Sequence, residues 1–334
     1  MDSFFVAANI FFLLSLSVLV HGKIAAKGCD IFQGSWVFDN SYPLYNSTEC
    51  PSIEKEFDCQ RNGRTDKDYM KYRWQPSGCK LPRFNGVDLL TKLKGKRLMF
   101  VGDSLGLNQW RSLTFMLHVA VPEAKYTSER IGDLFKFKFP DYNASIMFFW
   151  NAFLVDITSE PKGRVLRLDS ISNSKIWGGM ELLIFNSWHC WDLIVYGNST
   201  FKDMDRLSAY EKALQTWAKW RDSHVDTAKT KVFFQGVSPD HASKQDIESC
   251  MGKTRPVKYS SRPHPAELVL EKILRAMSKP VYLLNITELS DLRIDGHPSV
   301  YGSGGHSSMD CSHWCLAGVP GTWNELFYAA LVQN

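Results

Sequence analysis

From about Leu89 onward, short apolar runs alternate with amphipathic segments, and this alternation constrains the fold more than any other feature. Five runs have the character of strands, at residues 97–101, 145–155, 181–185, 231–235 and 281–284. Several are apolar on both faces, which is typical of a parallel sheet covered by helices. Apolar residues recur at helical spacing over 205–221, 265–277 and 323–332, and residues 106–117 can form a further helix. The pattern predicts an α/β domain with a mostly parallel sheet flanked by helices.

The first 26 residues form a separate segment. Between positions 4 and 20 the chain is uncharged and mainly apolar, which indicates entry into the secretory pathway. The run is at the short end for spanning a bilayer and no basic residue precedes it, so a signal peptide cleaved near Gly22 or Ala26 and a retained signal anchor both remain open. No later stretch is long and apolar enough to cross a membrane, so we expect the remainder to be lumenal or extracellular.

Eight cysteines agree with an oxidising compartment. An even number behind a signal segment favours up to four disulfides over buried thiols. Half of the cysteines lie between residues 28 and 80, where no long helical pattern occurs. We therefore expect a small disulfide-stapled module over residues 28–85 and a larger domain over residues 86–334. Sequons add candidate glycosylation sites at Asn46, Asn143, Asn198 and Asn285.

Composition narrows the class of partner. With 44% hydrophobic and 22% charged residues the chain can bury a large core, which excludes disordered and fibrous classes. The formal charge of +4 is spread without long basic runs, so no nucleic-acid partner is expected. Aromatic residues make up 13% of the chain and include 11 Trp, a side chain that suits sugar stacking as well as core packing. A carbohydrate partner is therefore a working hypothesis.

One serine stands where a nucleophile belongs in such a sheet. The apolar run at 97–101 leads directly into Gly102, Asp103 and Ser104, and a helix can follow. Ligands bind at the carboxyl ends of parallel strands. A serine in this turn also lies at a helix N-terminus, where the backbone N–H groups of Ser104 and Leu105 can stabilise an oxyanion. Gly102 allows close approach, and Asp103 is a candidate helix cap.

A serine nucleophile needs a base and a group that orients the base. Asp310 and His313, three residues apart in a loop before the last helix, are the candidates. Asn186 directly follows the strand at 181–185 and can offer its amide to the oxyanion hole. A zinc site built from Cys311, His313, Cys315 and His306 is the weaker alternative in an oxidising compartment. We therefore expect neither a metal nor a bound cofactor.

Several further residues are candidates for contact with a sugar. Trp188, Trp191 and Trp314 lie next to the proposed site residues, whereas Trp217 and Trp220 lie on a helical stripe and are expected in the core. His241 and His297 could bind substrate or be ordinary loop residues. Arg293 is the last candidate for sugar contact, and its alternative is a charged loop residue with no role in binding.

Longer blocks resemble a known family. Residues 101–113 (VGDSLGLNQWRSL) and 310–326 (DCSHWCLAGVPGTWNEL) are similar to the plant trichome birefringence-like family, and residues 185–189, 236–241 and 293–301 are similar to its intervening blocks. The resemblance extends from about Cys29 to the C-terminus. It implies a GDSL or SGNH-type esterase fold, and characterised members of the family are Golgi polysaccharide O-acetyltransferases.

The resemblance also implies individual roles. Ser104 would form an acetyl-enzyme, Asp310 and His313 would activate it, and Asn186 would be the oxyanion-hole asparagine. The implied disulfides are Cys29–Cys79, Cys59–Cys315 and Cys250–Cys311.

This chain departs from the family pattern at a few positions. Phe115 stands where many relatives have a cysteine, and Cys190 where relatives more often have Trp, so we hypothesise a replacement bridge between Cys50 and Cys190. Ala317 and Gly321 stand where many relatives have Pro and Asp. These two changes bear on loop geometry and leave the proposed triad untouched.

The resulting hypothesis is a plant cell-wall polysaccharide O-acetyltransferase. Ser104 takes acetyl from a donor such as acetyl-CoA or a derived compound, and a sugar hydroxyl deprotonated by His313 resolves the acetyl-enzyme. The alternatives are a wall polysaccharide acetylesterase with the same triad and a non-catalytic wall polysaccharide-binding protein. Pectin, xylan and mannan all remain as acceptors, with pectin favoured by family analogy. The expected location is the Golgi lumen through the signal anchor, or the cell wall after cleavage, with membrane contact only through the N-terminal segment.

Overall fold

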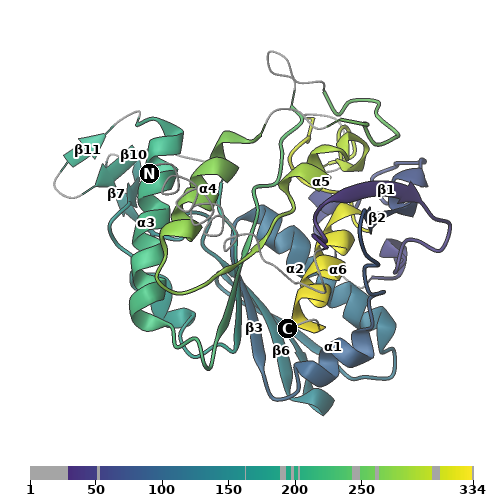
Figure 1. Cartoon of the computed structure of the whole chain (residues 1–334), viewed down its shortest axis with the longest axis horizontal. Helices are drawn as coiled ribbons and strands as arrows, with labels where there is room; N and C mark the ends of the chain where they lie inside the picture. Colours follow the sequence, from purple (N-terminus) through teal and green to yellow (C-terminus); the bar gives the residue numbers. More distant parts are fainter. Residues whose placement is uncertain are drawn as a thin grey trace, which may run out of the picture.

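The computed structural model describes residues 29–50, 53–161, 163–188, 193–196, 199–201, 204–242, 249–259, 263–302 and 309–332. Its centre is a seven-stranded sheet in the order β13-β12-β9-β3-β6-β5-β4 (Figure 1). In the same order the strands are Tyr282–Leu284, Lys231–Gln235, Leu182–Phe185, Arg97–Gly102, Ala144–Trp150, Leu134–Phe139 and Thr127–Ile131. Strands β13 to β6 run parallel, as the apolar runs predict, and β5 and β4 add an antiparallel hairpin at one edge.

One predicted strand is too long. Residues 145–155 form β6 only as far as Trp150, where Asn151 donates its N–H to the Gly102 carbonyl. Leu154 then adopts a left-handed conformation at φ 59°, which turns the chain out of the sheet. It enters a four-stranded sheet in the order β11-β10-β8-β7, made of Ser199–Phe201, Leu193–Tyr196, Gly163–Arg167 and Asp156–Glu160.

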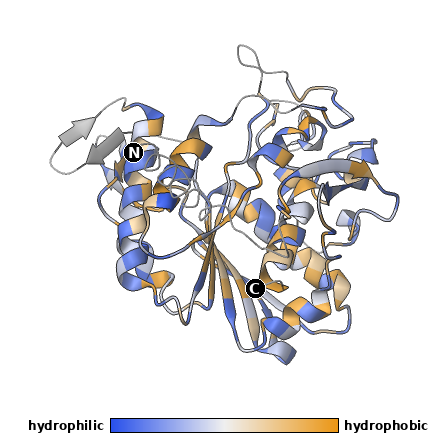
Figure 2. Cartoon of the chain, viewed as in Figure 1, coloured by the Kyte–Doolittle hydropathy of each residue, from blue (hydrophilic) through white to orange (hydrophobic). Residues whose placement is uncertain are grey.

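Helices cover both faces of the central sheet. Figure 1 shows α3 (Arg206–His224) and α4 (Pro265–Ala276) on one side, and α1 (Gly86–Lys92), α2 (Ser104–Ala120) and α6 (Val319–Val332) on the other, with α5 (Thr287–Asp291) above them. The alternation of β3 explains this arrangement, because Leu98 and Phe100 join the core under α2 and α6, whereas Met99 and Val101 join the core under α3 and α4. Figure 2 shows the sheet as an apolar layer between these helices. Trp217 and Trp220 are buried there, as predicted.

The N-terminal module packs against the sheet domain. It contains the antiparallel pair β1 (Gly34–Phe38) and β2 (Tyr72–Pro76) and short 3-10 turns at Ser47–Glu49, Lys55–Phe57 and Asp68–Lys71. The Trp36 indole donates to the Leu289 carbonyl in α5, and Cys59 is bonded to Cys315 across 256 positions. The module is thereby fastened to the loop that carries Asp310 and His313.

The three disulfides implied by the family resemblance are present, Cys29–Cys79, Cys59–Cys315 and Cys250–Cys311. The hypothesised bridge between Cys50 and Cys190 is wrong on the side of Cys50, which is a buried thiol beside the Asn46 carbonyl. Cys190 lies outside the described residues. Trp188, two positions earlier, packs on the α3 and α4 face of the sheet, whereas Cys50 packs on the α2 face. The sheet therefore separates Cys50 from Trp188.

The other N-terminal and surface predictions have mixed outcomes. Residues 1–26 lie outside the described part of the chain, within which no helix is long and apolar enough to span a membrane. Among the sequon asparagines, Asn46 and Asn143 are exposed and Asn285 is half-buried. Asn198 and Trp191 lie outside the residues whose side chains are described.

Candidate active site

Ser104 is the first residue of α2, directly beyond the carboxyl end of β3. The helix begins here because Asp103 caps it, accepting the Leu105 N–H at 2.9 Å. The predicted helix start at residue 106 is therefore two residues late. Ser104 is partly exposed, whereas Asp103 and Leu105 on either side are buried. The fold thus presents one hydroxyl at the edge of the sheet where the sequence places it.

The predicted triad partners meet at this hydroxyl. The Ser104 Oγ lies 2.7 Å from the His313 Nε2, and the His313 Nδ1 lies 2.7 Å from the Asp310 Oδ2. The other carboxylate oxygen of Asp310 accepts the backbone N–H groups of Ser312 and His313 and the Ser312 hydroxyl. These bonds fix the carboxylate, which in turn fixes the imidazole as a base directed at Ser104.

The charges of the pair support this geometry. Burial opposes ionisation of Asp310, but hydrogen bonds from the His313 ring and from backbone N–H groups outweigh it and lower the pKa of Asp310 well below its usual value. Burial likewise opposes the charged form of His313, but the Asp310 carboxylate outweighs it, and the pKa of His313 is raised. An ionised Asp310 thus favours the protonated form of the His313 ring.

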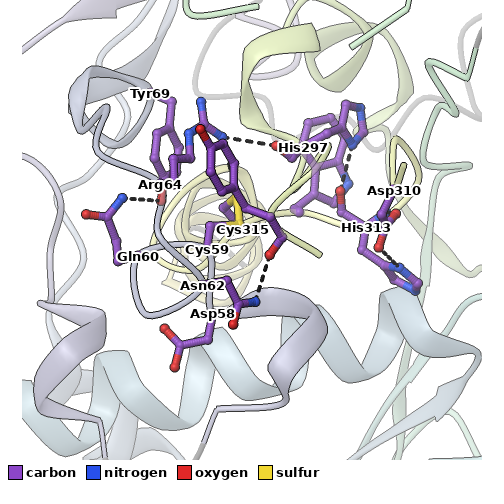
Figure 3. Close-up of a disulfide and its surroundings, with 12 residues drawn as sticks. Asp58, Cys59, Gln60, Asn62, Arg64, Tyr69, His297, Asp310, His313 and Cys315 are labelled. Carbon is purple, nitrogen blue, oxygen red and sulfur yellow. Dashed lines mark hydrogen bonds and ion pairs between the residues drawn. A yellow bond between two sulfur atoms is a disulfide. The ribbon is translucent and has the colours of Figure 1, made fainter. Parts of the chain in front are cut away.

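The loop that carries His313 is held from several sides (Figure 3). The Asn108 side chain, one turn after Ser104 in α2, exchanges two hydrogen bonds with the backbone of Trp314. The Phe57 ring packs against the His313 ring at 5.5 Å between centroids. The disulfides of Cys311 and Cys315 close the loop on either side of His313. Sequence reasoning missed Asn108, although a polar residue four positions after Ser104, on the same helical face, was the available signal.

The predicted oxyanion hole needs correction. Asn186 follows β9 beside Ser104, but its amide donates one hydrogen to Asp103, and Asp103 also accepts the Trp188 N–H at 3.2 Å. The Leu105 N–H is likewise taken by Asp103 and is not available as an oxyanion donor. An amide nitrogen carries two hydrogens, so Asn186 keeps a second donor. Asp103 is therefore a hub that orders this part of the site, beyond the capping role predicted for it.

Two glycines make room for the Asn186 side chain. A Cβ on Gly102 would lie 1.8 Å from the Asn186 Oδ1, and a Cβ on Gly106 would lie 2.2 Å from the same atom. Neither distance is compatible with a side chain at those positions. Glycine at both positions is thus a direct requirement of an asparagine seated between β3, β9 and the first turn of α2.

Most of the predicted sugar-contacting residues are buried. Trp314 is fully buried and its indole donates to Ser238, and Arg293 is buried in an ion pair with Asp295. His297 and His241 are buried and hydrogen-bonded to each other. These four predictions are wrong as direct sugar contacts, because partners distant in sequence cover the side chains.

Trp188 is the one predicted aromatic that stays partly exposed among the described residues. Its ring packs edge-on against Tyr210 and His264, and the Arg206 guanidinium lies 4.1 Å above one face. It lies beside Asp103 and so borders the site, and its contact with a sugar stays a prediction.

A zinc site is incompatible with the disulfides. Cys311 and Cys315 are both oxidised, so neither offers a thiolate, and His306 lies outside the described residues. Within the described part of the chain no group of His, Cys, Asp or Glu side chains has the arrangement of a metal site.

An α/β fold with a serine at the carboxyl edge of a parallel sheet and an aspartate-histidine loop beside it defines a GDSL/SGNH-like protein. Residues 81–330 match the GDSL/SGNH-like acyl-esterase family found in Pmr5 and Cas1p, and residues 27–80 match the PMR5 N-terminal domain. The chain belongs to the plant trichome birefringence-like family.

Three relatives in Arabidopsis thaliana align with this chain over most of their length. Protein trichome birefringence-like 43 is 57% identical over 92% of this chain and 89% of its own. Protein trichome birefringence-like 41 is 52% identical over 96% of this chain and 95% of its own. Protein trichome birefringence-like 39 is 47% identical over 94% of this chain and 90% of its own.

Proposed function

We propose that this protein is a cell-wall polysaccharide O-acetyltransferase that works through an acetyl ester on Ser104. The observation that carries the proposal is the unbroken hydrogen-bonded series from Asp310 through His313 to the Ser104 hydroxyl. Membership of an acyl-esterase family supports acyl-ester chemistry at this serine. The same intact series argues against the alternative of a non-catalytic binding protein.

The reaction has two halves. In the first, the Ser104 Oγ attacks the acetyl carbonyl of the donor while the His313 Nε2 takes the hydroxyl proton. The tetrahedral oxygen accepts hydrogen bonds from the Ser104 backbone N–H and the second N–H of Asn186. The donor's carrier group then leaves with the proton from His313, and the acetyl-enzyme remains.

In the second half, His313 removes a proton from a sugar hydroxyl, which attacks the acetyl carbonyl on Ser104. The intermediate collapses, the acetylated sugar leaves, and the proton returns from His313 to the Ser104 Oγ. Hydrolysis follows the same route with water in place of the sugar, so retention of water in the site decides between the two outcomes. The description of the matching family as acyl-esterases makes an acetylesterase the second candidate.

The disulfides support a compartment of the secretory pathway. Three bridges suit an oxidising lumen. The proposed workplace is the Golgi lumen, with residues 4–20 as a signal anchor, or the cell wall if that segment is cleaved.

The full chain, purified from a secretory host, tests the proposal. Wild type and Ser104→Ala are incubated with an acetyl donor and a panel of deacetylated pectin, xylan and mannan oligosaccharides. Mass spectrometry then detects any acetyl groups added to the oligosaccharides. Acetyl gain on one oligosaccharide, lost in Ser104→Ala, supports the transferase and identifies the acceptor. Acetate release from acetylated oligosaccharides without any gain would replace it by the esterase.

A further inference from the structure

Two buried histidines lie directly behind the loop of His313. His297 follows the short turn Ile294–Gly296, and His241 lies in the loop after β12. They are 1% and 5% exposed. Neither can touch a substrate, and the reaction described above does not use them. Their contacts nevertheless form a continuous line that ends on the backbone of His313.

Three hydrogen bonds make up this line. The His297 Nδ1 lies 2.6 Å from the carbonyl oxygen of His313. The His297 Nε2 lies 2.7 Å from the His241 Nδ1. The His241 Nε2 lies 3.1 Å from the backbone carbonyl oxygen of Asp291 and 3.3 Å from a carboxylate oxygen of the same residue.

The number of protons in this line follows from its ends. A carbonyl oxygen only accepts, so the His297 Nδ1 and the His241 Nε2 must each carry a hydrogen. The central contact joins two ring nitrogens at 2.7 Å, and it is a hydrogen bond only if one hydrogen lies between them. Three hydrogens on four ring nitrogens make the pair singly positive. Two neutral rings would instead bring two bare lone pairs together in the interior.

The surroundings decide which ring is charged. His297 is enclosed by the Trp314 indole, stacked on it at 3.9 Å between centroids, and burial next to His241 lowers the pKa of His297 well below its usual value. His241 has the Asp291 carboxylate as a partner. The other charged or titratable groups around the pair are Arg64, which donates to the His297 carbonyl, and Asp310 and His313 of the catalytic loop. The charge therefore belongs on His241, and His297 is the neutral ring with its hydrogen on Nδ1.

We propose that His241 and His297 form a singly protonated pair that positions the catalytic loop, by holding the backbone carbonyl of His313 through the His297 Nδ1. The loop is then hydrogen-bonded both to Asn108 on α2, through Trp314, and to His297, through the His313 carbonyl. His241 and His297 are positioning residues that act through His313. Their effect on catalysis rests on the function proposed above. The Asp291 carboxylate, 3.3 Å from the His241 Nε2, balances the positive charge of the shared proton.

The protonation is tested on the wild-type full chain with ring-¹⁵N-labelled histidine. We expect nuclear magnetic resonance at about pH 7 to show both ring nitrogens of His241 protonated and one of His297. In Asp291→Asn, which keeps the backbone carbonyl and removes the carboxylate charge, the spectrum at the same pH should show two ring protons on the pair instead of three. A His241 ring with one proton in the wild type, or an unchanged number of ring protons in Asp291→Asn, would overturn the assignment.

The positioning role is tested by His297→Phe, which keeps a ring on Trp314 and removes both nitrogens. His224→Phe is the matched control, because His224 also stacks on a tryptophan, Trp220, but is exposed at the end of α3. The readout is the rate at which a phosphonate probe modifies Ser104, which needs the triad but neither an acetyl donor nor a sugar. We expect a rate about tenfold lower in His297→Phe, corresponding to a small loss of preorganisation, and an unchanged rate in His224→Phe.

The outcomes separate this inference from the proposed function. A normal phosphonylation rate in a folded His297→Phe refutes positioning, whatever the acetyl-transfer assay shows. A slowed rate together with no acetyl transfer by the wild type supports positioning and refutes the transferase. Should His297→Phe fail to fold, the spectra of the wild type and of Asp291→Asn decide.

Discussion

Asp310→Asn is the substitution whose effect the structure defines most closely. The side-chain oxygen of Asn can still accept the N–H groups of Ser312 and His313, so the loop keeps its shape. The amide nitrogen then faces the His313 Nδ1, 2.7 Å away in the wild type, where a hydrogen donor meets a hydrogen donor. The ring escapes this clash by moving its proton to Nε2. In that tautomer His313 cannot accept the proton of Ser104.

The expected loss is about 10⁴-fold in kcat with little change in KM, which corresponds to about 5 kcal/mol of transition-state stabilisation. The pH profile should change as well. In the wild type the active, neutral form of His313 appears only as the pH rises through a pKa that Asp310 raises above its usual value. Removing the carboxylate lowers that pKa, so the acid limb of kcat/KM should move to lower pH.

The assay is acetyl transfer, or acetate release if hydrolysis prevails, measured across pH with circular dichroism as a check of folding. Asp68→Asn is the matched control, because Asp68 forms an exposed ion pair with Lys71 outside the site. An activity loss below about tenfold in Asp310→Asn would refute the role given to the carboxylate. A shift of the acid limb to higher pH would contradict the sign of the coupling.

Three further predictions follow from other contacts. Gly106→Ala should displace the Asn186 side chain, because the new Cβ falls 2.2 Å from its Oδ1, and should lower kcat by about 10²-fold; normal activity would exclude Asn186 from the oxyanion site. Glu325, whose pKa burial raises to about 7, binds its proton more tightly when folded, so its stabilising contribution is full at low pH and is lost as the pH rises to about 7. In urea unfolding measured across pH, Glu325→Gln should reduce the change of unfolding free energy with pH by about 3 kcal/mol. A pH dependence equal to that of the wild type would count against this role of Glu325. Replacing Cys59 and Cys315 together by alanine should cost about 2 to 5 kcal/mol of unfolding free energy and loosen the His313 loop; unchanged stability would show that the bridge is dispensable.

The sequence predicts the central strands and the nucleophile well because both depend on local pattern. Continuous apolar runs define β3, β9 and β12, and the turn after β3 carries Ser104 whatever the rest of the chain does. The edge strand β4 is exposed along its length and gives no burial signal, so it escaped prediction. The end of β6 also escaped, because it depends on a hydrogen bond from Asn151 to a neighbouring strand.

The environment of the site was less predictable because it depends on distant partners. Arg293 and His297 resemble ligand-binding residues in sequence, yet each is buried by groups from the N-terminal module or from the loop after β12. The same holds for Trp314, whose indole partner Ser238 is 76 positions away. The position of Trp314 next to His313 in the sequence was therefore a poor guide to contact with substrate. Trp314 instead supports the loop, through its backbone bonds to Asn108.

The central claim is that an acetyl group passes through Ser104. The most direct measurement is to incubate the full chain with acetyl donor alone, stop the reaction with acid, digest the protein and identify acetylated peptides by mass spectrometry. The account predicts an ester on Ser104 that accumulates without acceptor, disappears when acceptor is added, and is absent in Ser104→Ala. Acetyl transfer that persists in Ser104→Ala, or an acetyl ester on a different residue that turns over with acceptor, would contradict it.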